Sequence, residues 1–151
     1  MKSVTVELKP RDLEKAEKFA EARIEKSLDQ YSRRGQTNID KIKYDITVGA
    51  LGEIGIYRML KRLGIKVSPP DFNVYEVKNK SYDADLQDKD GYRFHCKSQS
   101  RDSADTYGNS YILQYGGNGN GHIDKLFKSR TNRDFLIPCL VDIDTKEVII
   151  Y

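Results

Sequence analysis

Cysteine and histidine are scarce in this sequence, which contains two residues of each type. So few thiols and imidazoles argue against a structural zinc site. Cys96 and Cys139 each lie within an apolar run, which is typical of buried free thiols in a reducing compartment rather than of a disulfide framework. The N-terminus lacks the apolar stretch of a signal peptide, and no run is long enough to cross a bilayer. These absences predict a soluble, cytoplasmic protein that does not enter a membrane.

Length and charge set the next limits. The chain has 151 residues, the usual size of one domain, and 38% of them are hydrophobic, which suffices for a core. A formal net charge of +3 is too mild to indicate a nucleic-acid partner by itself. A basic face can still exist, because 26 Lys and Arg stand against 23 Asp and Glu.

Hydrophobic periodicity divides the chain into a helical first part and a β-rich second part. Apolar residues at helical spacing predict helices at 11–31, with Asp12 near its start and Gly35 after its end, and at 48–63. A strand at 3–8 precedes them, and 36–47 reads as a loop or short strand. Further strands are predicted at 72–77, 82–87, 92–98, 110–115, 135–143 and 147–151, with a short helix at 123–128.

This order of elements predicts an α+β or mixed α/β domain, in which a central mixed β-sheet is flanked by helices. The whole chain, 1–151, is expected to form one domain. Its parts would be an N-terminal strand and long helix (1–35), a core (48–115) and a helix with a C-terminal hairpin (123–151).

The most informative segment is a predicted hairpin between residues 82 and 97. Lys89-Asp90-Gly91 suits a three-residue loop with glycine in the left-handed position, which would pair Leu86 with Phe94 and Asp85 with His95. A two-residue Asp-Gly loop would shift the register by one residue and exchange the faces. The three-residue register sorts the side chains better. It gathers the polar residues Asp83, Asp85, His95 and Lys97 on one face and the apolar residues Ala84, Leu86, Phe94 and Cys96 on the other. A solvated face with surface ion pairs would also explain the polar side.

The arrangement of these polar residues resembles the PD-(D/E)xK, or restriction-endonuclease-like, nuclease superfamily. Asp85 is followed, after nine residues, by His95-Cys96-Lys97 on the next predicted strand. Those enzymes also carry a glutamate on a preceding helix, and Glu53 lies on the second predicted helix within 49–55, a segment with three glycines. Since glycine costs a helix up to about 1 kcal/mol relative to alanine, these glycines indicate close packing against the sheet. A loosely formed helix start is the alternative.

The resemblance implies a metal-dependent endonuclease that hydrolyses DNA. Glu53, Asp85, the backbone carbonyl of Cys96 and His95 would hold Mg²⁺ or Mn²⁺, and Lys97 would position or activate the attacking water. Asp83 and Gln99 are secondary candidates for the site. His95 stands where the family usually has Asp or Glu, which would favour Mn²⁺, since imidazole suits softer metals. The same departure allows a degenerate site in a protein that binds DNA without cutting it.

A second match to the family's letters lies at Asp71 followed by Glu76-Val77-Lys78. Only four residues separate Asp71 from Glu76, too few for two paired strands and a turn. This segment is therefore predicted to be a strand with an exposed ion pair.

Basic residues around a glycine-rich loop at 116–121 are the predicted contacts to double-stranded DNA. They are Arg101, Lys125, Lys128, Arg130 and Arg133. A mobile surface loop beside a solvated helix is the structural alternative. By analogy with small nucleases of phages and mobile elements, a homodimer is a further expectation. A small interaction module, whose long N-terminal helix binds a partner, is the third interpretation.

Overall fold

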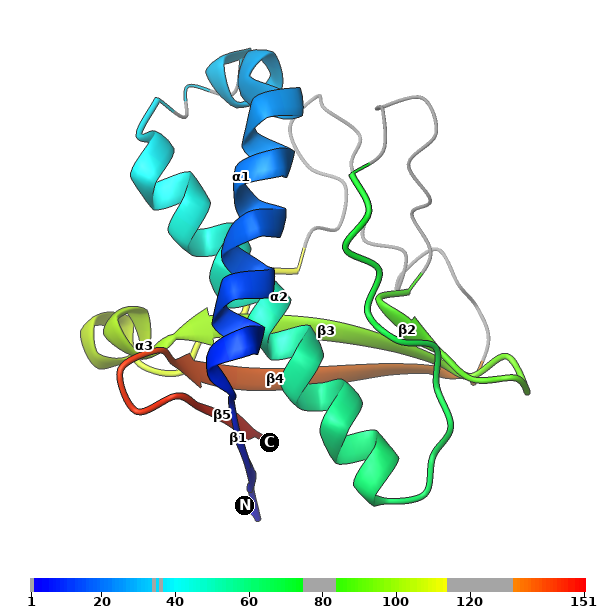
Figure 1. Ribbon diagram of the computed structural model, residues 1–151. Helices are drawn as coiled ribbons and strands as arrows, with labels where there is room; N and C mark the ends of the chain where they lie inside the picture. Colours follow the sequence, from blue (N-terminus) through cyan, green and yellow to red (C-terminus); the bar gives the residue numbers. More distant parts are fainter. Residues whose placement is uncertain (1, 34, 36, 75–83, 114–131) are drawn as a thin grey trace.

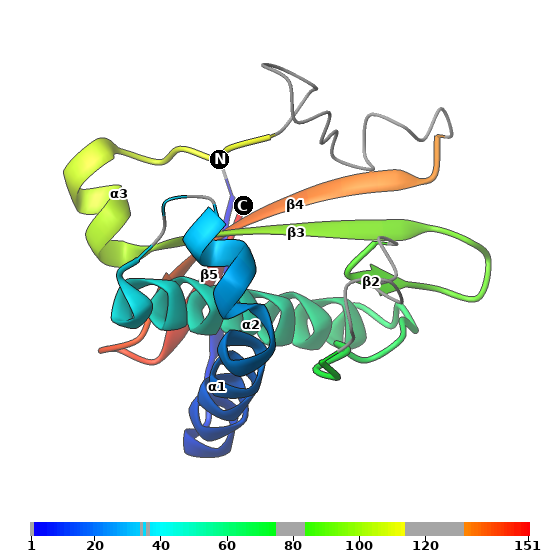
Figure 2. The same ribbon diagram turned by 90° about the horizontal axis from the view of Figure 1, so that it is seen from above.

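The computed structural model describes residues 2–33, 35, 37–74, 84–113 and 132–151. A five-stranded mixed sheet has the order β1-β5-β4-β3-β2. Helix α2 packs on one face of the sheet, and α1 packs on the outer side of α2 (Figures 1 and 2). The elements in chain order are β1 (Val4–Glu7), α1 (Pro10–Arg33), α2 (Ile39–Arg62), β2 (Leu86–Gln87), β3 (Arg93–Ser100), α3 (Arg101–Tyr107), β4 (Asp134–Asp142) and β5 (Glu147–Ile150).

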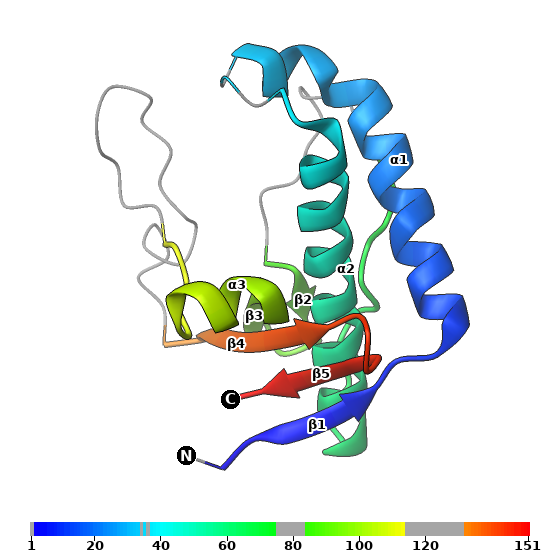
Figure 3. The ribbon, with the colours of Figure 1, turned by 90° about the vertical axis from the view of Figure 1, so that its left-hand side faces the viewer.

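Two kinds of strand pairing build the sheet. Strands β3 and β4 are parallel, and the chain between them includes α3. The other neighbours are antiparallel, and Val4 pairs with Ile150, so the two ends of the chain lie side by side (Figure 3). The predicted α+β architecture with a mixed sheet is therefore confirmed at this level. Within the described residues, no helix combines the length and the apolar character needed to cross a membrane.

The hydrophobic core lies between α2 and the sheet, with the start of α1 at its margin. Its fully buried side chains come from elements far apart in the sequence, and they include Val6, Leu51, Ile56, Leu86, Val141 and Val148. The core therefore fixes α2 against the sheet, and α2 carries Glu53.

Helix α1 begins close to where the sequence predicted. Pro10 opens the helix, a position at which its missing N–H costs nothing. Asp12, two residues later, accepts a hydrogen bond from the backbone N–H of Lys9 at 2.6 Å. Asp12 thus caps the helix from within its first turn, by reaching back, rather than from the residue before it. At the other end, α1 stops at Arg33, and Gly35 follows with a φ of 70°.

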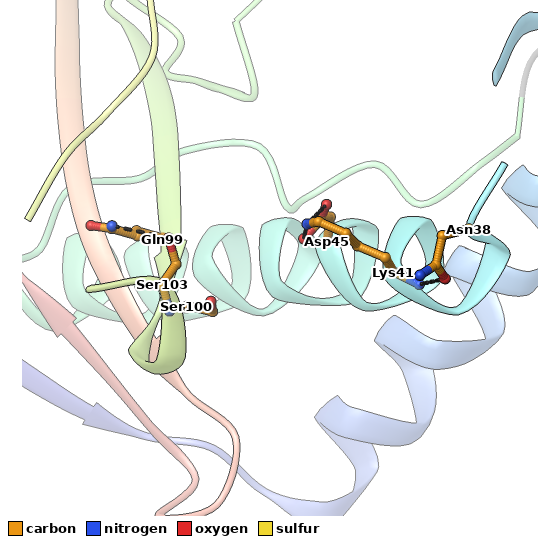
Figure 4. A network of polar contacts seen from close by, with 6 residues as sticks. All are labelled: Asn38, Lys41, Asp45, Gln99, Ser100 and Ser103. Carbon is orange, nitrogen blue, oxygen red and sulfur yellow. Dashed lines mark hydrogen bonds and ion pairs between the residues drawn. The ribbon is translucent and has the colours of Figure 1, made fainter. Parts of the chain in front are cut away.

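The second helix corrects the sequence prediction for residues 36–47. That segment was expected to be a loop or short strand, with the helix starting at residue 48, but α2 begins at Ile39. Asn38 caps the helix by accepting a hydrogen bond from the N–H of Lys41 at 3.0 Å (Figure 4). The β-branched residues that follow disfavour a helix locally. The burial of Ile42 and Val48 against the rest of the protein overrides this preference.

Other strand boundaries also differ from the prediction. Residues 72–74 and 110–113 form no strand, and within the described residues 84–87 of the predicted 82–87 strand only Leu86–Gln87 is a strand. The predicted helix at 123–128 lies outside the described residues. Helix α3, which the sequence analysis missed, starts at a serine cap: the Ser100 hydroxyl accepts a hydrogen bond from the Ser103 N–H at 3.2 Å. Seven residues are too few for a helical period to stand out.

Two of the three glycines of α2 pack closely against the sheet, as predicted. A Cβ atom at Gly52 would lie 2.9 Å from the Cys139 Sγ and closer still to the Ser98 hydroxyl. A Cβ atom at Gly55 would lie 2.7–2.8 Å from the side chain of Val148. At Gly49, by contrast, no atom lies within 4 Å of the added Cβ. The approach of α2 to β3, β4 and β5 therefore depends on Gly52 and Gly55.

This difference gives a matched pair of substitutions. Gly52→Ala should lower the free energy of unfolding by about 1–3 kcal/mol, because β3 and β4 must shift away from α2. Gly49→Ala, on the same helix, should raise it by about 0.4–1 kcal/mol through helix propensity alone. Urea denaturation of the two variants measures both values. Equal effects would contradict the close packing at Gly52.

Candidate active site

The hairpin that carries Asp85 and His95 has the register predicted from its loop. Leu86 pairs with Phe94, and the Asp88 N–H donates to the carbonyl of Tyr92 at 3.0 Å across a loop in which Gly91 has a φ of 82°. The Asp88 carboxylate closes the loop by accepting hydrogen bonds from two backbone N–H groups, at 2.9 and 2.8 Å. The three-residue loop is confirmed, and it places Asp85 opposite His95.

Side chains alternate along β3, so its residues divide between the two faces of the sheet. Phe94 lies in the core, Cys96 packs against it, and Ser98 faces Gly52 of α2. His95, Lys97 and Gln99 therefore project from the face opposite α2. Along β3 the predicted separation of apolar from polar residues is confirmed, whereas Asp83 lies outside the described residues and the Asp85 carboxylate does not share the face of His95 and Lys97. Glu53, however, approaches β3 from the α2 side, whereas His95 and Lys97 leave from the other.

Asp85 lies at the edge of the sheet, between these two sets. It occupies a bend just before the two-residue strand β2, and its Oδ2 accepts a hydrogen bond from the Cys96 N–H at 2.6 Å. The N–H and C=O of one strand residue point to the same side, so the carbonyl of Cys96 faces this edge as well. The edge thus presents a carboxylate beside a backbone carbonyl.

Glu53 and Asp85 form a pair of carboxyl groups that share a poorly solvated environment. Burial of Glu53, followed by the charge of Asp85, raises the pKa of Glu53 to about 8. Asp85 is exposed on its outer side, but its carboxylate faces the protein, and desolvation raises its pKa too. The Cys96 N–H, His95 and Lys97 oppose that rise. With a pKa of about 8, Glu53 retains its proton at neutral pH.

His95 is held by a buried carboxylate that the sequence analysis did not identify. Its Nε2 lies 2.8 Å from the Asp134 Oδ1, and the Asp134 Oδ2 accepts a hydrogen bond from Arg93 at 2.7 Å. The Asp134 side chain is only 4% exposed and that of His95 12%. The contact with Asp134 orients the imidazole ring through Nε2. No local signal marks Asp134, since it lies 39 residues from His95.

Two further residues near Glu53 were missed or assigned differently. Asp71 is close enough to raise the pKa of Glu53, and Arg23 of α1 is close enough to lower it. Asp71 was predicted to start a strand with an exposed ion pair, but it lies in an irregular segment, where its carboxylate accepts a hydrogen bond from the Asn73 N–H at 2.9 Å. Residues 76–78 of that weaker motif lie outside the described residues.

The remaining predicted residues have structural contacts or lie outside the description. Gln99 is buried, and its amide bonds Ser103 and the 108–110 segment (Figure 4). Arg101 donates to the Asp142 carboxylate at 3.2 Å. Arg133 donates to the carbonyl of Asp90 at 2.8 Å. Gln99 is thus part of the scaffold, and both arginines already have partners. Four predicted residues lie outside the described ranges: Asp83, Lys125, Lys128 and Arg130.

Both cysteines are free thiols, as the sequence predicted. Burial raises the pKa of Cys96 far above its usual value and that of Cys139 to about 11. The raised pKa values disfavour the thiolate form of both groups at neutral pH, as is typical of buried structural cysteines.

The donor groups at the edge suit a hard divalent cation. Two carboxylates and a backbone carbonyl are oxygen ligands of the kind that Mg²⁺ and Mn²⁺ prefer. Across the described ranges, no group of three or more His, Cys, Asp and Glu side chains has the geometry of a metal site. The fit therefore rests on Glu53, Asp85 and the carbonyl of Cys96.

Comparisons with known protein families, with curated proteins and with solved structures found no match to this chain.

Proposed function

We propose that this protein is a metal-dependent endonuclease with a restriction-endonuclease-like core, which hydrolyses phosphodiester bonds of double-stranded DNA. The observation that carries the proposal is the Glu53–Asp85 carboxyl pair beside the strand of His95 and Lys97. The glutamate comes from a helix, the aspartate from the start of one strand and the lysine from the next. This is the order that the resemblance to the nuclease superfamily implies.

Each residue of the edge has a role in the proposed reaction. Glu53, Asp85 and the Cys96 carbonyl would hold Mg²⁺ or Mn²⁺, which polarises the scissile phosphate and lowers the pKa of a bound water. Glu53 must lose its proton for this, so the affinity for the cation should rise with pH. The positive charge of Lys97 lowers the pKa of Asp85. In the proposed reaction the same ammonium would offset negative charge that develops on the phosphate.

The role of His95 is narrower than the sequence suggested. Asp134 occupies Nε2, so only Nδ1 is available for a metal ion or a metal-bound water. A carboxylate that orients a histidine in this way is a common supporting contact at metal sites. The carboxylate pair alone would supply both acidic ligands.

A second candidate is a nuclease-fold protein that binds DNA without cutting it. The observation in its favour is the position of His95, which leaves β3 on the face opposite α2 while Glu53 approaches from the α2 side. In this candidate the Glu53–Asp85 pair would have no catalytic role. The affinity for DNA would then not depend on a divalent cation.

Substitution of Lys97 tests the proposal. The parent protein should convert supercoiled plasmid to nicked or linear forms with Mg²⁺ or Mn²⁺ and not with EDTA. Lys97→Ala should slow this by at least about 100-fold, the usual contribution of a group that assists proton transfer. Its affinity for DNA should stay within a few-fold, because one lysine makes one contact among many.

Lys89→Ala is the matched control, since Lys89 lies exposed on the hairpin loop of the same strand pair. Its cleavage rate should equal that of the parent. A parent that binds DNA and leaves plasmid intact with both metals would favour the non-cutting candidate. A parent that neither binds nor cuts would exclude both.

A further inference from the structure

A cavity between α1 and α2 opens onto Glu53. Its volume is about 260 Å³, and its lining includes Phe19 and Arg23 of α1 and Asp45, Gly49 and Glu53 of α2. Because Gly49 has no side chain, it does not cover Glu53 on this side of the cavity. Glu53 is therefore reachable from the α1 side of the protein, away from the sheet face of His95 and Lys97.

Arg23 is the cation of this cavity. Its guanidinium carbon lies 5.9 Å from the centroid of the Phe19 ring, and Phe19 is itself packed against Phe72 at 5.1 Å between ring centroids. Among the ion pairs of the described ranges, none involves Arg23. A half-buried guanidinium thus stands near Glu53 without a direct carboxylate partner.

The other charges of the cavity do not compete for Arg23. Asp45 is neutralised by Lys41, whose Nζ lies 2.8 and 3.1 Å from its two carboxylate oxygens (Figure 4). Glu53 also lines the cavity, but no ion pair of the described ranges joins its carboxyl group to Arg23. Arg23 is therefore the only cation among the residues that line the cavity, and no ion pair of the described ranges offsets its charge, which suits an anionic ligand.

We propose that Arg23 is a phosphate-binding residue, which holds a phosphodiester group of the DNA strand in the α1–α2 cavity beside the Glu53–Asp85 pair. This inference rests on the proposed function and adds the substrate contact to it. Guanidinium is suited to the task because its planar fork of donors matches two phosphate oxygens. Phe19 restricts the side chain, so less conformational entropy is lost on binding.

The binding test uses a short fluorescent DNA duplex in EDTA, so that no cleavage interferes, with fluorescence anisotropy as the readout. Arg23→Gln should raise the Kd at least about tenfold, which corresponds to about 1.4 kcal/mol and to the lower end of what a charge-assisted contact contributes. It should also reduce the slope of log K against log salt by about 0.9, the value for one phosphate contact. Arg23→Lys keeps the charge but lacks the planar guanidinium. Its Kd should lie between those of the parent and of Arg23→Gln. Thermal unfolding of each variant shows that the fold is retained.

Arg62→Gln is the matched control, because Arg62 is exposed at the end of α2 and carries the same charge. Its Kd and salt slope should equal those of the parent. If Arg23→Gln also behaves like the parent, the inference is overturned, and plasmid cleavage by the parent would still support the proposed function.

The converse result is distinguishable as well. A Kd that depends on Arg23, in a parent that never cleaves plasmid, would support the phosphate contact and overturn the nuclease. Inorganic phosphate serves as the second ligand, to separate a free anion from a nucleic acid. Binding of phosphate that depends on Arg23, without binding of the duplex, would overturn the assignment to DNA.

Discussion

Glu53→Gln should abolish metal-dependent cleavage and, at alkaline pH, make the metal-free protein more stable than the parent. Both effects have one cause. Glu53 is held in a desolvated position beside Asp85, which raises its pKa from 4.5 to about 8. The same proximity would let the two carboxylates share a cation. The glutamine amide therefore removes a metal ligand and also removes the repulsion between the Glu53 and Asp85 charges. We expect at least about a 100-fold loss of rate, because loss of even an outer-shell partner of a metal costs 10–100-fold.

The sign of the pH effect follows from proton binding. Between pH 4.5 and about 8 the folded protein keeps the Glu53 proton that the unfolded chain releases. The free energy of unfolding of the parent should therefore fall as the pH rises through this window and level off above it. Each pKa unit corresponds to about 1.4 kcal/mol, so Glu53→Gln should gain a few kcal/mol over the parent at pH 9. At pH 4 the two proteins should be alike.

Urea unfolding at several pH values, with and without Mn²⁺, measures this difference. Glu25→Gln is the control, since Glu25 is an exposed residue of α1, and its stability should follow that of the parent at every pH. At pH 9, Mn²⁺ should raise the free energy of unfolding of the parent again and leave that of Glu53→Gln unchanged. A Glu53→Gln protein that is destabilised equally at all pH values would show that the carboxyl is structural.

Asp12→Ala should cost about 3–5 kcal/mol of stability, the usual effect of removing one partner of a buried ion pair. The Asp12 side chain is 8% exposed and contacts both terminal nitrogens of Arg58, at 2.6 and 2.7 Å. Arg58 also donates to the carbonyl of Glu7 at 3.2 Å. These contacts join α1, α2 and β1. Without Asp12, the guanidinium is left largely buried and α1 loses its N-terminal cap.

Chemical denaturation of Asp12→Ala and Asp12→Asn, compared with Glu14→Ala, measures this effect. Glu14 belongs to the same turn of α1, but its ion pair with Lys18 is exposed, so Glu14→Ala should be close to neutral. Asp12→Asn keeps an acceptor for the cap and should lose less stability than the alanine variant. If Asp12→Ala and Glu14→Ala were equivalent, the ion pair with Arg58 would have no part in docking α1, and with it Arg23, onto α2.

Local sequence patterns predicted the elements that depend on near neighbours. The first helix was predicted from its apolar spacing, and Gly35 ends it. Lys89-Asp90-Gly91 predicted the register that places Asp85 opposite His95, because a turn type sets the pairing of the strands it joins. The same patterns did not predict very short elements, nor segments in which burial outweighs the local conformational preference. Helix α3 is too brief to show a period, and the start of α2 has β-branched residues whose burial outweighs their preference.

Four residues of the proposed site were predicted from the resemblance to the nuclease superfamily: Glu53, Asp85, His95 and Lys97. Their spatial relation was not. The sequence placed the three strand residues on one face, yet the bend at Asp85 turns its carboxylate to the edge of the sheet, towards the Cys96 N–H. Bends of this kind depend on where a strand stops pairing, which is decided by the whole sheet.

Contacts between distant segments were decided by tertiary structure only. Asp134 reaches His95 because β3 and β4 run parallel, a pairing that brings together residues 39 positions apart. Arg23 reaches the Glu53 cavity because α1 packs along α2. Neither residue stands out in the sequence, where an aspartate at a strand start and an arginine on an amphipathic helix are ordinary. The sequence determined which acidic and basic side chains the chain carries. The packing of α1, α2 and the sheet determined which of them share a desolvated space, and burial raises the pKa of Glu53.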